Sequence, residues 1–104
     1  MRTNITARHF KASDKLKDFA EKKVLKLNKY YDGIIDCEIL LESERHERIA
    51  DISLNVYSQK LQAVEKSEEF EKSIELCVDK LERQLKKYKE KLKAHSPVEI
   101  ESEE

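Results

Sequence analysis

The sequence predicts an α+β fold, a β-α-β-β-β-α two-layer sandwich in which two helices pack on one face of a four-stranded sheet. Two patterns predict it. Four segments alternate apolar and polar residues with a period of two, and two longer segments repeat apolar residues every three or four positions. A chain of 104 residues, 38% of them hydrophobic, has room for one modest core. We therefore expect a single domain over residues 1–95 and a short, disordered acidic tail at residues 96–104.

The first strand and first helix occupy the opening third of the chain. The strand is expected in "TNITARHF", because apolar and polar residues alternate there and several are β-branched. Ser13 is the predicted N-cap of the helix. Helical spacing continues for about five turns, until Gly33 in "YYDGII" supplies a stop. The apolar positions of this helix are Leu16, Phe19, Ala20, Val24, Leu27 and Tyr31.

Three further strands are expected as an antiparallel meander. In "IDCEILLE" the residues on one face are Ile35, Cys37, Ile39 and Leu41. After the polar turn "SERHER", the segment "IADISLNVYS" places Ala50, Ile52, Leu54 and Val56 on one face. A short turn near Ser58 and Gln59 leads into "KLQAV". Alternation of this kind is typical of a sheet with one buried and one solvent-exposed face. The solvent-exposed face is expected to carry the acidic and polar side chains.

A long second helix is expected from about Ser67 to the region before Pro97. Its apolar positions advance by alternating fours and threes, and they are Ile74, Val78, Leu81, Leu85, Tyr88 and Leu92. Since Tyr88 lies on this apolar seam, we expect its ring to be packed and its hydroxyl to reach the basic rim of the helix.

The net charge of −1 conceals two oppositely charged parts of the chain. Residues 11–29 carry seven lysines against three acids, and residues 79–95 carry seven basic against three acidic residues. The intervening residues 32–78 carry five basic and twelve acidic residues, and the tail from Ser96 adds four acids. A surface built only for solubility would mix the signs, whereas this chain places acids on strands and bases on helices.

The basic residues of each predicted helix lie along one flank beside the apolar positions. They are Lys80, Arg83, Lys87 and Lys91 in the second helix and Lys15, Lys22, Lys26 and Lys29 in the first. If the helices lie side by side, we expect the two rows to combine into one positive surface that attracts phosphate. Structured RNA fits such a surface better than a DNA sequence element, because no helix starts with base-reading Asn, Gln and Arg. For either row alone, a helix face that merely confers solubility is the alternative.

No pattern of catalytic or metal-binding residues is evident, so we expect no enzyme activity and no cofactor. His9, His46 and His95 are scattered, and none has metal-ligand spacing with Cys37 or Cys77. With one glycine in the chain, a backbone loop that cradles nucleotide phosphates is almost excluded. Both cysteines are expected to be reduced and buried in a cytoplasmic protein, and no apolar run approaches the roughly 20 residues that cross a bilayer.

A protein-interaction module is the second functional hypothesis. In the second helix, heptad-like spacing could form an intermolecular coiled coil from Ile74, Leu81 and Tyr88 with Val78, Leu85 and Leu92. The apolar face of the sheet must be buried, however, and the second helix of the same chain can bury it. This favours an intramolecular role for the seam and a monomeric protein. Membrane binding is less favoured, because the basic face lacks an exposed Trp or Phe to insert.

Several segments resemble the ribosome hibernation-promoting factors, a family also called ribosome-associated inhibitor A or sigma-54 modulation proteins. The similarity covers about residues 3–95. It is carried by "NIT", "KVLKLNKYYD", "ADISLNV" and, most specifically, "DKLERQLKKYKEKLK". The resemblance implies a fold like the double-stranded RNA-binding domain, in its short form without the additional domain through which long forms pair ribosomes. It also implies that residues 1–95 bind the small ribosomal subunit, its 16S rRNA and neighbouring ribosomal proteins, and block the tRNA and mRNA sites in stationary phase.

The basic rows and this resemblance together define the candidate RNA-binding residues. They are Lys22, Lys23, Lys26, Lys29, Lys80, Arg83, Gln84, Lys86, Lys87, Lys89 and Lys91. One departure from the family is clear: Glu71 stands in "EFEKSIE" where the family usually has a tyrosine. A contact that depends on that tyrosine ring is therefore not expected in this chain.

Overall fold

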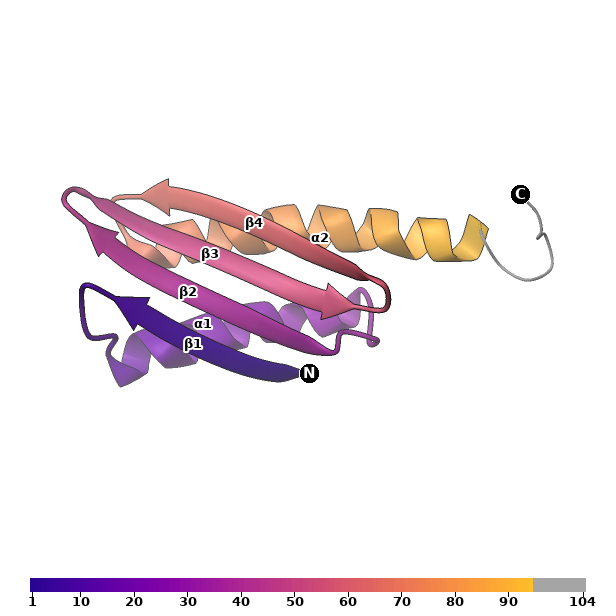
Figure 1. The fold of residues 1–104 in the computed structure, drawn as a ribbon, viewed down its shortest axis with the longest axis horizontal. Helices are drawn as coiled ribbons and strands as arrows, with labels where there is room; N and C mark the ends of the chain where they lie inside the picture. The colour runs from indigo at the N-terminus through magenta and orange to yellow at the C-terminus, as the bar shows by residue number, and fades with distance from the viewer. Residues whose placement is uncertain (95–104) are drawn as a thin grey trace.

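The computed structural model describes residues 1–94, with the side chains of the last two left out, and confirms the predicted order of elements (Figure 1). The elements are β1 (Arg2–Arg8), α1 (Asp14–Leu25), a 3₁₀ turn η1 (Lys26–Lys29), β2 (Asp36–Glu44), β3 (Glu47–Val56), β4 (Gln59–Ser67) and α2 (Phe70–Ala94). The acidic tail at residues 96–104, which is expected to be disordered, lies outside the described residues, as does His95.

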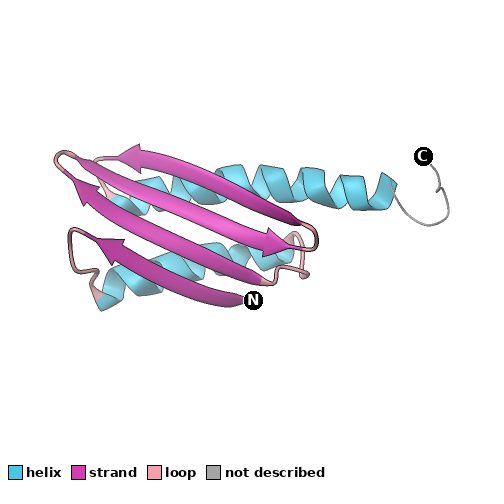
Figure 2. Cartoon of the chain, viewed as in Figure 1, coloured by secondary structure: helices cyan, strands magenta, loops and turns pink. Residues whose placement is uncertain are grey.

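The four strands form one sheet in the order β1-β2-β3-β4. Strands β2, β3 and β4 pair antiparallel, as the meander predicts, while β1 pairs parallel to β2. A parallel pair needs a crossover connection, and α1 with η1 supplies it. Both helices run side by side in the same general direction across one face of the sheet (Figures 1 and 2). The predicted α+β sandwich is confirmed.

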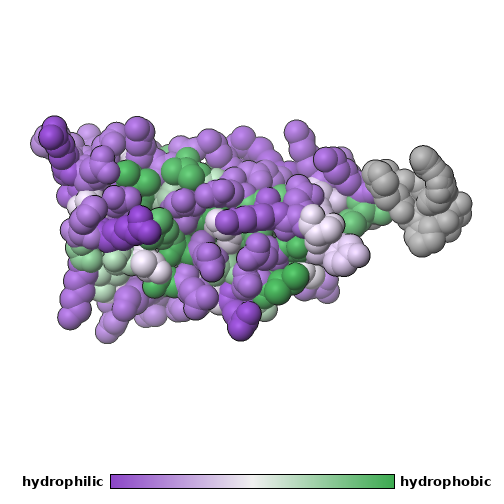
Figure 3. All heavy atoms as spheres, in the orientation of Figure 1, coloured by the Kyte–Doolittle hydropathy of each residue, from purple (hydrophilic) through white to green (hydrophobic). Residues whose placement is uncertain are grey.

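The core lies between the sheet and the two helices. The inward positions of β2 and β3 are buried as the alternation predicts, and they meet the apolar seam of α2. The largest fully buried side chains are Leu27, Ile39, Leu41, Ile52, Leu54, Ile74, Leu81 and Leu85. The opposite face of the sheet is open and largely hydrophilic, with small apolar areas (Figure 3).

The first helix begins where it was predicted but is shorter than five turns. Its N-cap is Ser13, whose Oγ accepts a hydrogen bond from the Leu16 amide at 3.1 Å. Regular α-helix ends at Leu25, and the chain tightens into η1, where the Tyr30 amide donates to the Leu27 carbonyl at 3.0 Å. This tighter turn keeps Leu27 fully buried.

Gly33 does not end the helix, because η1 already closes at Lys29. Its φ angle is not positive, so the left-handed conformation does not explain the glycine. A Cβ atom at this position would overlap the ring of Tyr31. The glycine is therefore required by close approach of that ring, which packs edge-on against Tyr88 with centroids 5.4 Å apart.

Two apolar residues do not lie where the sequence patterns place them. The regular pleat of β2 begins at Asp36, so the alternation does not reach Ile35, which is 55% exposed while Ile34 enters the core. Leu92 was expected on the buried seam but is 41% exposed. A 25-residue helix is about 37 Å long, whereas nine-residue β4 spans about 30 Å, so the last turns of α2 project beyond the sheet (Figure 1).

Tyr88 marks the point where α2 leaves the sheet. Its ring is packed, as predicted, but its hydroxyl does not reach the basic rim. Instead, the hydroxyl donates to the carbonyl of Tyr57 in the β3–β4 turn at 2.8 Å. This bond and the burial of the ring hold the last covered turn of the helix against the end of the sheet.

The difference between covered and projecting turns of α2 is measurable. Leu85→Ala leaves a cavity in a fully buried site and should lower the free energy of unfolding by about 2–5 kcal/mol. Leu92→Ala, the matched control about two turns further on, should change it by no more than about 0.5 kcal/mol. Urea denaturation followed by circular dichroism measures both. Equal losses would show that Leu92 is buried after all.

Candidate nucleic-acid interface

The exposed side chains of α2 fall into three groups because the apolar seam fixes the rotation of the helix. At 100° per residue, one flank of α2 faces β4, the other faces α1, and an outer arc faces away from the sheet. Each group contains some of the predicted RNA-binding residues, but their surroundings differ.

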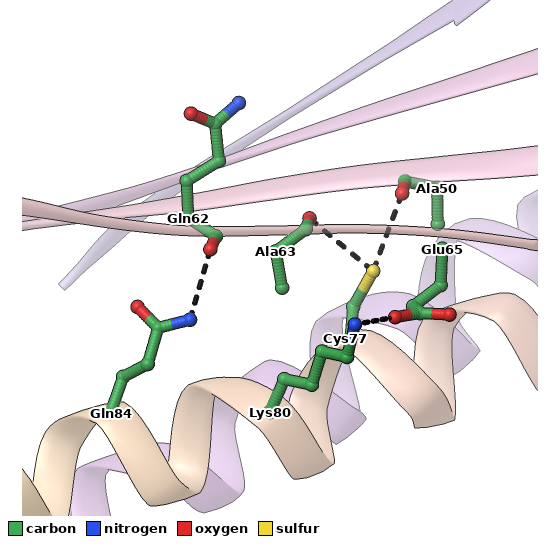
Figure 4. Close-up of polar contacts among 7 residues, drawn as sticks. All are labelled: Ala50, Gln62, Ala63, Glu65, Cys77, Lys80 and Gln84. Atoms are coloured by element: carbon green, nitrogen blue, oxygen red, sulfur yellow. Dashed lines mark hydrogen bonds and ion pairs between the residues drawn. The ribbon is translucent and has the colours of Figure 1, made fainter.

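The flank that faces β4 is tied to the sheet (Figure 4). The Lys80 ammonium forms an ion pair with the carboxylate of Glu65 on β4. One turn later, the Gln84 amide donates from Nε2 to the Gln62 carbonyl at 3.0 Å. Two predicted RNA-binding residues thus contact the edge strand, although the Lys80 side chain is 53% exposed and can exchange its partner much as an exposed lysine does.

Cys77 lies at the centre of the same contact (Figure 4). Its Sγ is 3.3 Å from the Ala50 carbonyl and 3.4 Å from the Ala63 carbonyl, with the thiol as donor. Burial, reinforced by the nearby Glu65 carboxylate, raises the pKa of Cys77 to about 12. Burial together with two neighbouring carboxylates raises the pKa of Cys37 to about 12 as well. Both cysteines are free and buried, as predicted.

The flank of α2 that faces α1 carries three acids, Glu75, Asp79 and Glu82. They line a groove of about 410 Å³ between the helices, opposite Lys23 and Lys26. Lys23 Nζ lies 3.2 Å from Glu75 Oε2 and joins the two helices. The expectation that the two basic rows merge into one continuous positive surface is therefore wrong, because an acidic seam separates them over the first half of α2.

Lys86 lies on this flank one turn beyond the acidic seam. Its Nζ is 3.1 Å from Glu82 Oε2 and 5.2 Å from the centre of the Tyr30 ring. An exposed ion pair one turn apart contributes only a few tenths of a kcal/mol, so Lys86 can exchange this partner for a phosphate at little cost.

The remaining cations of the predicted site are exposed and, within residues 1–94, six of them have neither an ion-pair nor a hydrogen-bond partner. These six are Lys22, Lys26, Lys29, Arg83, Lys87 and Lys89. Lys91 is also exposed and does have an interaction partner. The structure thus divides the predicted residues into cations that are held by the fold and cations that are available.

Five of the six available cations, all except Lys22, gather at one end of the helical layer. The helices run in the same direction, so η1 lies beside the second half of α2, as the Tyr31–Tyr88 ring contact shows. Residues 83–91 of α2 carry five basic residues and one acid, whereas residues 70–82 carry two basic residues and four acids. We call the end of the helical layer that carries Lys26, Lys29, Arg83, Lys87 and Lys89 the basic end. These side chains surround α2 and do not form one flat face, since Lys87 lies toward β4 beside Gln59 and Leu61 and Lys89 lies about 200° further round the helix.

Neither a metal site nor a membrane span accompanies this surface. Within residues 1–94, no three His, Cys, Asp or Glu side chains come together in a way that could hold a metal ion. None of the described helices is both long enough and apolar enough to cross a bilayer.

The sequence and the fold both match known proteins. A model of the family described as Sigma 54 modulation protein / S30EA ribosomal protein matches residues 3–93. The chain belongs to this family. This confirms the membership that the sequence resemblance predicts.

Members of the family from several bacteria are similar over nearly their whole length. The chain is 35% identical to the ribosome hibernation promoting factor of Klebsiella oxytoca and 33% identical to that of Escherichia coli K12. Each match covers 91% of this chain and 100% of the relative. A ribosomal subunit interface protein from Coxiella burnetii has a TM-score of 0.81 at 27% identity, covering 86% of this chain and 98% of that one. The N-terminal domain of Thermus thermophilus Protein Y shares the fold, with a TM-score of 0.78 at 24% identity over 85% and 99% of the two chains.

Glu71, which the sequence resemblance marks as a departure from the family pattern, lies in the first turn of α2 and is exposed. A carboxylate in this position complements the positive end of the helix dipole. It lies at the opposite end of α2 from the basic end, so the substitution does not disturb the group of available cations.

Sequence reasoning missed the acidic seam, although the spacing of its residues could have revealed it. Glu75, Asp79 and Glu82 are four and three residues apart, which places them on one helix flank just as firmly as Lys80, Arg83 and Lys87. The ion pair between Lys23 and Glu75 could not be predicted from residue spacing, because it depends on how the two helices pack against each other.

The buried thiols predict a pH effect on stability. Between about pH 9 and pH 12 an unfolded chain loses thiol protons that the folded chain keeps, so stability falls as the pH rises through this window. Each thiol contributes a slope of about 1.4 kcal/mol per pH unit. Urea denaturation of the wild type and of Cys77→Ala is measured at pH 8.5 and 10.5. Both proteins have the same lysines, so the difference between their losses of stability reports the Cys77 thiol alone. The variant should lose less stability than the wild type, and equal losses would contradict burial of this thiol.

Proposed function

We propose that this family member is a ribosome-associated hibernation factor that binds 16S rRNA of the small subunit through the basic end. In this proposal it blocks the tRNA and mRNA sites in stationary phase simply by occupying them, without catalysing a reaction. It acts in the cytoplasm as a monomer and meets neighbouring ribosomal proteins on the subunit. The observation that carries the proposal is the concentration of exposed, unpartnered cations where η1 adjoins the second half of α2.

The electrostatics of the basic end suit a phosphate backbone. Lys26, Arg83 and Lys87 have no internal ion pair to break before they bind a phosphate. The electrostatic free energy of binding is therefore not reduced by the loss of an existing interaction. Arg83 can also bind a phosphate with two parallel hydrogen bonds. Each phosphate that is neutralised releases counterions, so binding should weaken steeply as salt rises.

The predicted residues divide into two roles in this proposal. Lys22, Lys26, Lys29, Arg83, Lys87 and Lys89 contact RNA directly, and Lys91 joins them by exchanging its present interaction. Lys23, Lys80 and Gln84 act mainly as positioning residues, because they join α2 to α1 or to β4. Lys86 lies between these roles, since its ion pair with Glu82 is exposed and weak.

The names of the relatives support a ribosomal target. The similar proteins from Klebsiella oxytoca and Escherichia coli are called ribosome hibernation promoting factors, and the Coxiella burnetii structure is a ribosomal subunit interface protein. A rigid two-helix layer that presents cations without a base-reading helix suits recognition of RNA by shape and backbone.

Dimerisation through α2, the alternative function, is disfavoured by the structure. The seam that would form a coiled coil already packs on the sheet within the same chain, where Ile74, Leu81 and Leu85 are fully buried. Only Leu92 of the predicted seam is substantially exposed. One apolar residue cannot replace the sustained heptads that a coiled coil requires.

Charge reversal at the basic end should abolish most of the binding to small subunits. The double variant Arg83→Glu/Lys87→Glu is predicted to bind at least tenfold more weakly at about 100 mM salt. The slope of log affinity against log salt should also become shallower by about two. Co-sedimentation with purified 30S subunits over a salt series measures both effects.

The matched control is Lys11→Glu/Lys72→Glu, which makes the same change in net charge at exposed positions far from the basic end. It should keep nearly wild-type affinity. If both double variants lose affinity equally, overall charge rather than the basic end governs binding. If neither loses affinity, RNA contact through the basic end is refuted.

A further inference from the structure

The open face of the sheet, on the side away from the helices, contains a hollow that the RNA-binding proposal does not use. It has a volume of about 600 Å³ and spans all four strands. Figure 3 views the molecule from this side and shows a mainly hydrophilic surface with apolar areas between the polar side chains. The polar residues that matter for the argument are Asn4, Glu38, Asp51, Ser53 and Gln62.

Strand register places these residues next to one another. Asn4 of β1 pairs with Glu38 of β2, which pairs with Ser53 of β3, which pairs with Gln62 of β4. Asp51 lies two residues before Ser53 and so is the diagonal neighbour of Glu38 on the same face. Because Ser53 is small and its neighbours are long, the middle of this row is recessed.

Ser53 is the unusual member of the row. It is only 6% exposed, yet its hydroxyl has no hydrogen-bond partner among residues 1–94. Buried polar groups in folded proteins nearly always have a partner, and one without a partner calls for an explanation. Its place in the lining of the hollow means that a group bound there would supply that partner.

Arg8 and Lys60 line the hollow as well, so any preference for a cation is local to the two carboxylates, which are diagonal neighbours in the middle of the sheet. Glu38 is exposed and has no ion-pair partner among the described residues. Asp51 Oδ1 accepts a hydrogen bond from Gln62 Nε2 at 2.9 Å, which leaves Oδ2 for another donor. Diagonal neighbours across strands are about 7–8 Å apart, so one planar cation between them can reach both carboxylates.

We propose that this hollow binds an arginine side chain from an extended basic segment of a partner protein. The guanidinium donates to the carboxylates of Glu38 and Asp51 and to the Ser53 hydroxyl. Five N–H donors in a planar fork suit these acceptors better than a lysine ammonium does, and the weaker hydration of guanidinium favours a recessed site. Lys60 and Arg8, which also line the hollow, can donate hydrogen bonds to backbone carbonyls of the same segment. RNA fits less well, because its phosphates would be repelled by the two central carboxylates.

The test uses an N-acetylated, amidated octapeptide in which arginine and glycine alternate, titrated into the ¹⁵N-labelled full-length protein. Amide shift changes should cluster at residues 4, 38, 51, 53 and 62. Glu38→Gln/Asp51→Asn should weaken binding at least tenfold, and Ser53→Ala about threefold. The matched control Glu44→Gln removes an exposed acid at the end of β2, outside the hollow, and should leave binding unchanged. Glu38→Gln alone, at an exposed and unpartnered site, replaces the double variant if that variant does not fold.

Three outcomes would overturn the proposal. The peptide could shift only residues of the acidic seam between the helices, it could bind the Glu38 and Glu44 variants equally, or it could fail to bind. A parallel titration with a short RNA hairpin gives a fourth: if RNA perturbs the hollow more strongly than the peptide does, the site is one for phosphate. The peptide titration contains no ribosome or RNA, so its result is independent of whether the basic end binds rRNA.

Discussion

Burial of the apolar seam of α2 against β3 and β4 is the contact on which the rest of this structure depends. Leu81 and Leu85 fix the rotation of the helix, and Cys77 lets it approach the backbone carbonyls of two strands. Once that rotation is set, every charged residue of α2 is assigned to a flank. A change of one residue in the phase of the seam would turn the helix by 100° and bury lysines in place of leucines.

The fixed rotation explains why so basic a helix offers only part of its charge to a ligand. Lys80 and Gln84 are directed to β4, where they hold the helix on the edge strand, and the acids of the other flank meet α1. What remains is an arc of cations around the second half of α2, joined by those of η1. The same sandwich leaves the other sheet face to acidic and polar side chains. The molecule therefore presents two chemically different faces, for which we propose phosphate and guanidinium ligands respectively.

Much of this architecture could be predicted because it follows from local periodicity. The strand faces apart from Ile35, the Ser13 cap and the α2 seam apart from Leu92 are patterns within one element, and they were predicted correctly. The errors arose where one element meets another. Leu92 is exposed because the sheet ends before the helix does. The acidic seam separates the basic rows because of how the helices pack, and the isolated hydroxyl of Ser53 depends on its neighbours in three other strands.

The central claim is that the basic end contacts 16S rRNA, and a site-specific cross-link tests it most directly. A photo-activatable diazirine side chain at position 87, within the basic end, is irradiated on purified small subunits, and the cross-linked partner is identified. The same group at position 72, in the first turn of α2, serves as the control. The account predicts a cross-link to 16S rRNA from position 87 that is much stronger than from position 72. A cross-link from position 87 only to protein, or equal rRNA cross-linking from both positions, would contradict it.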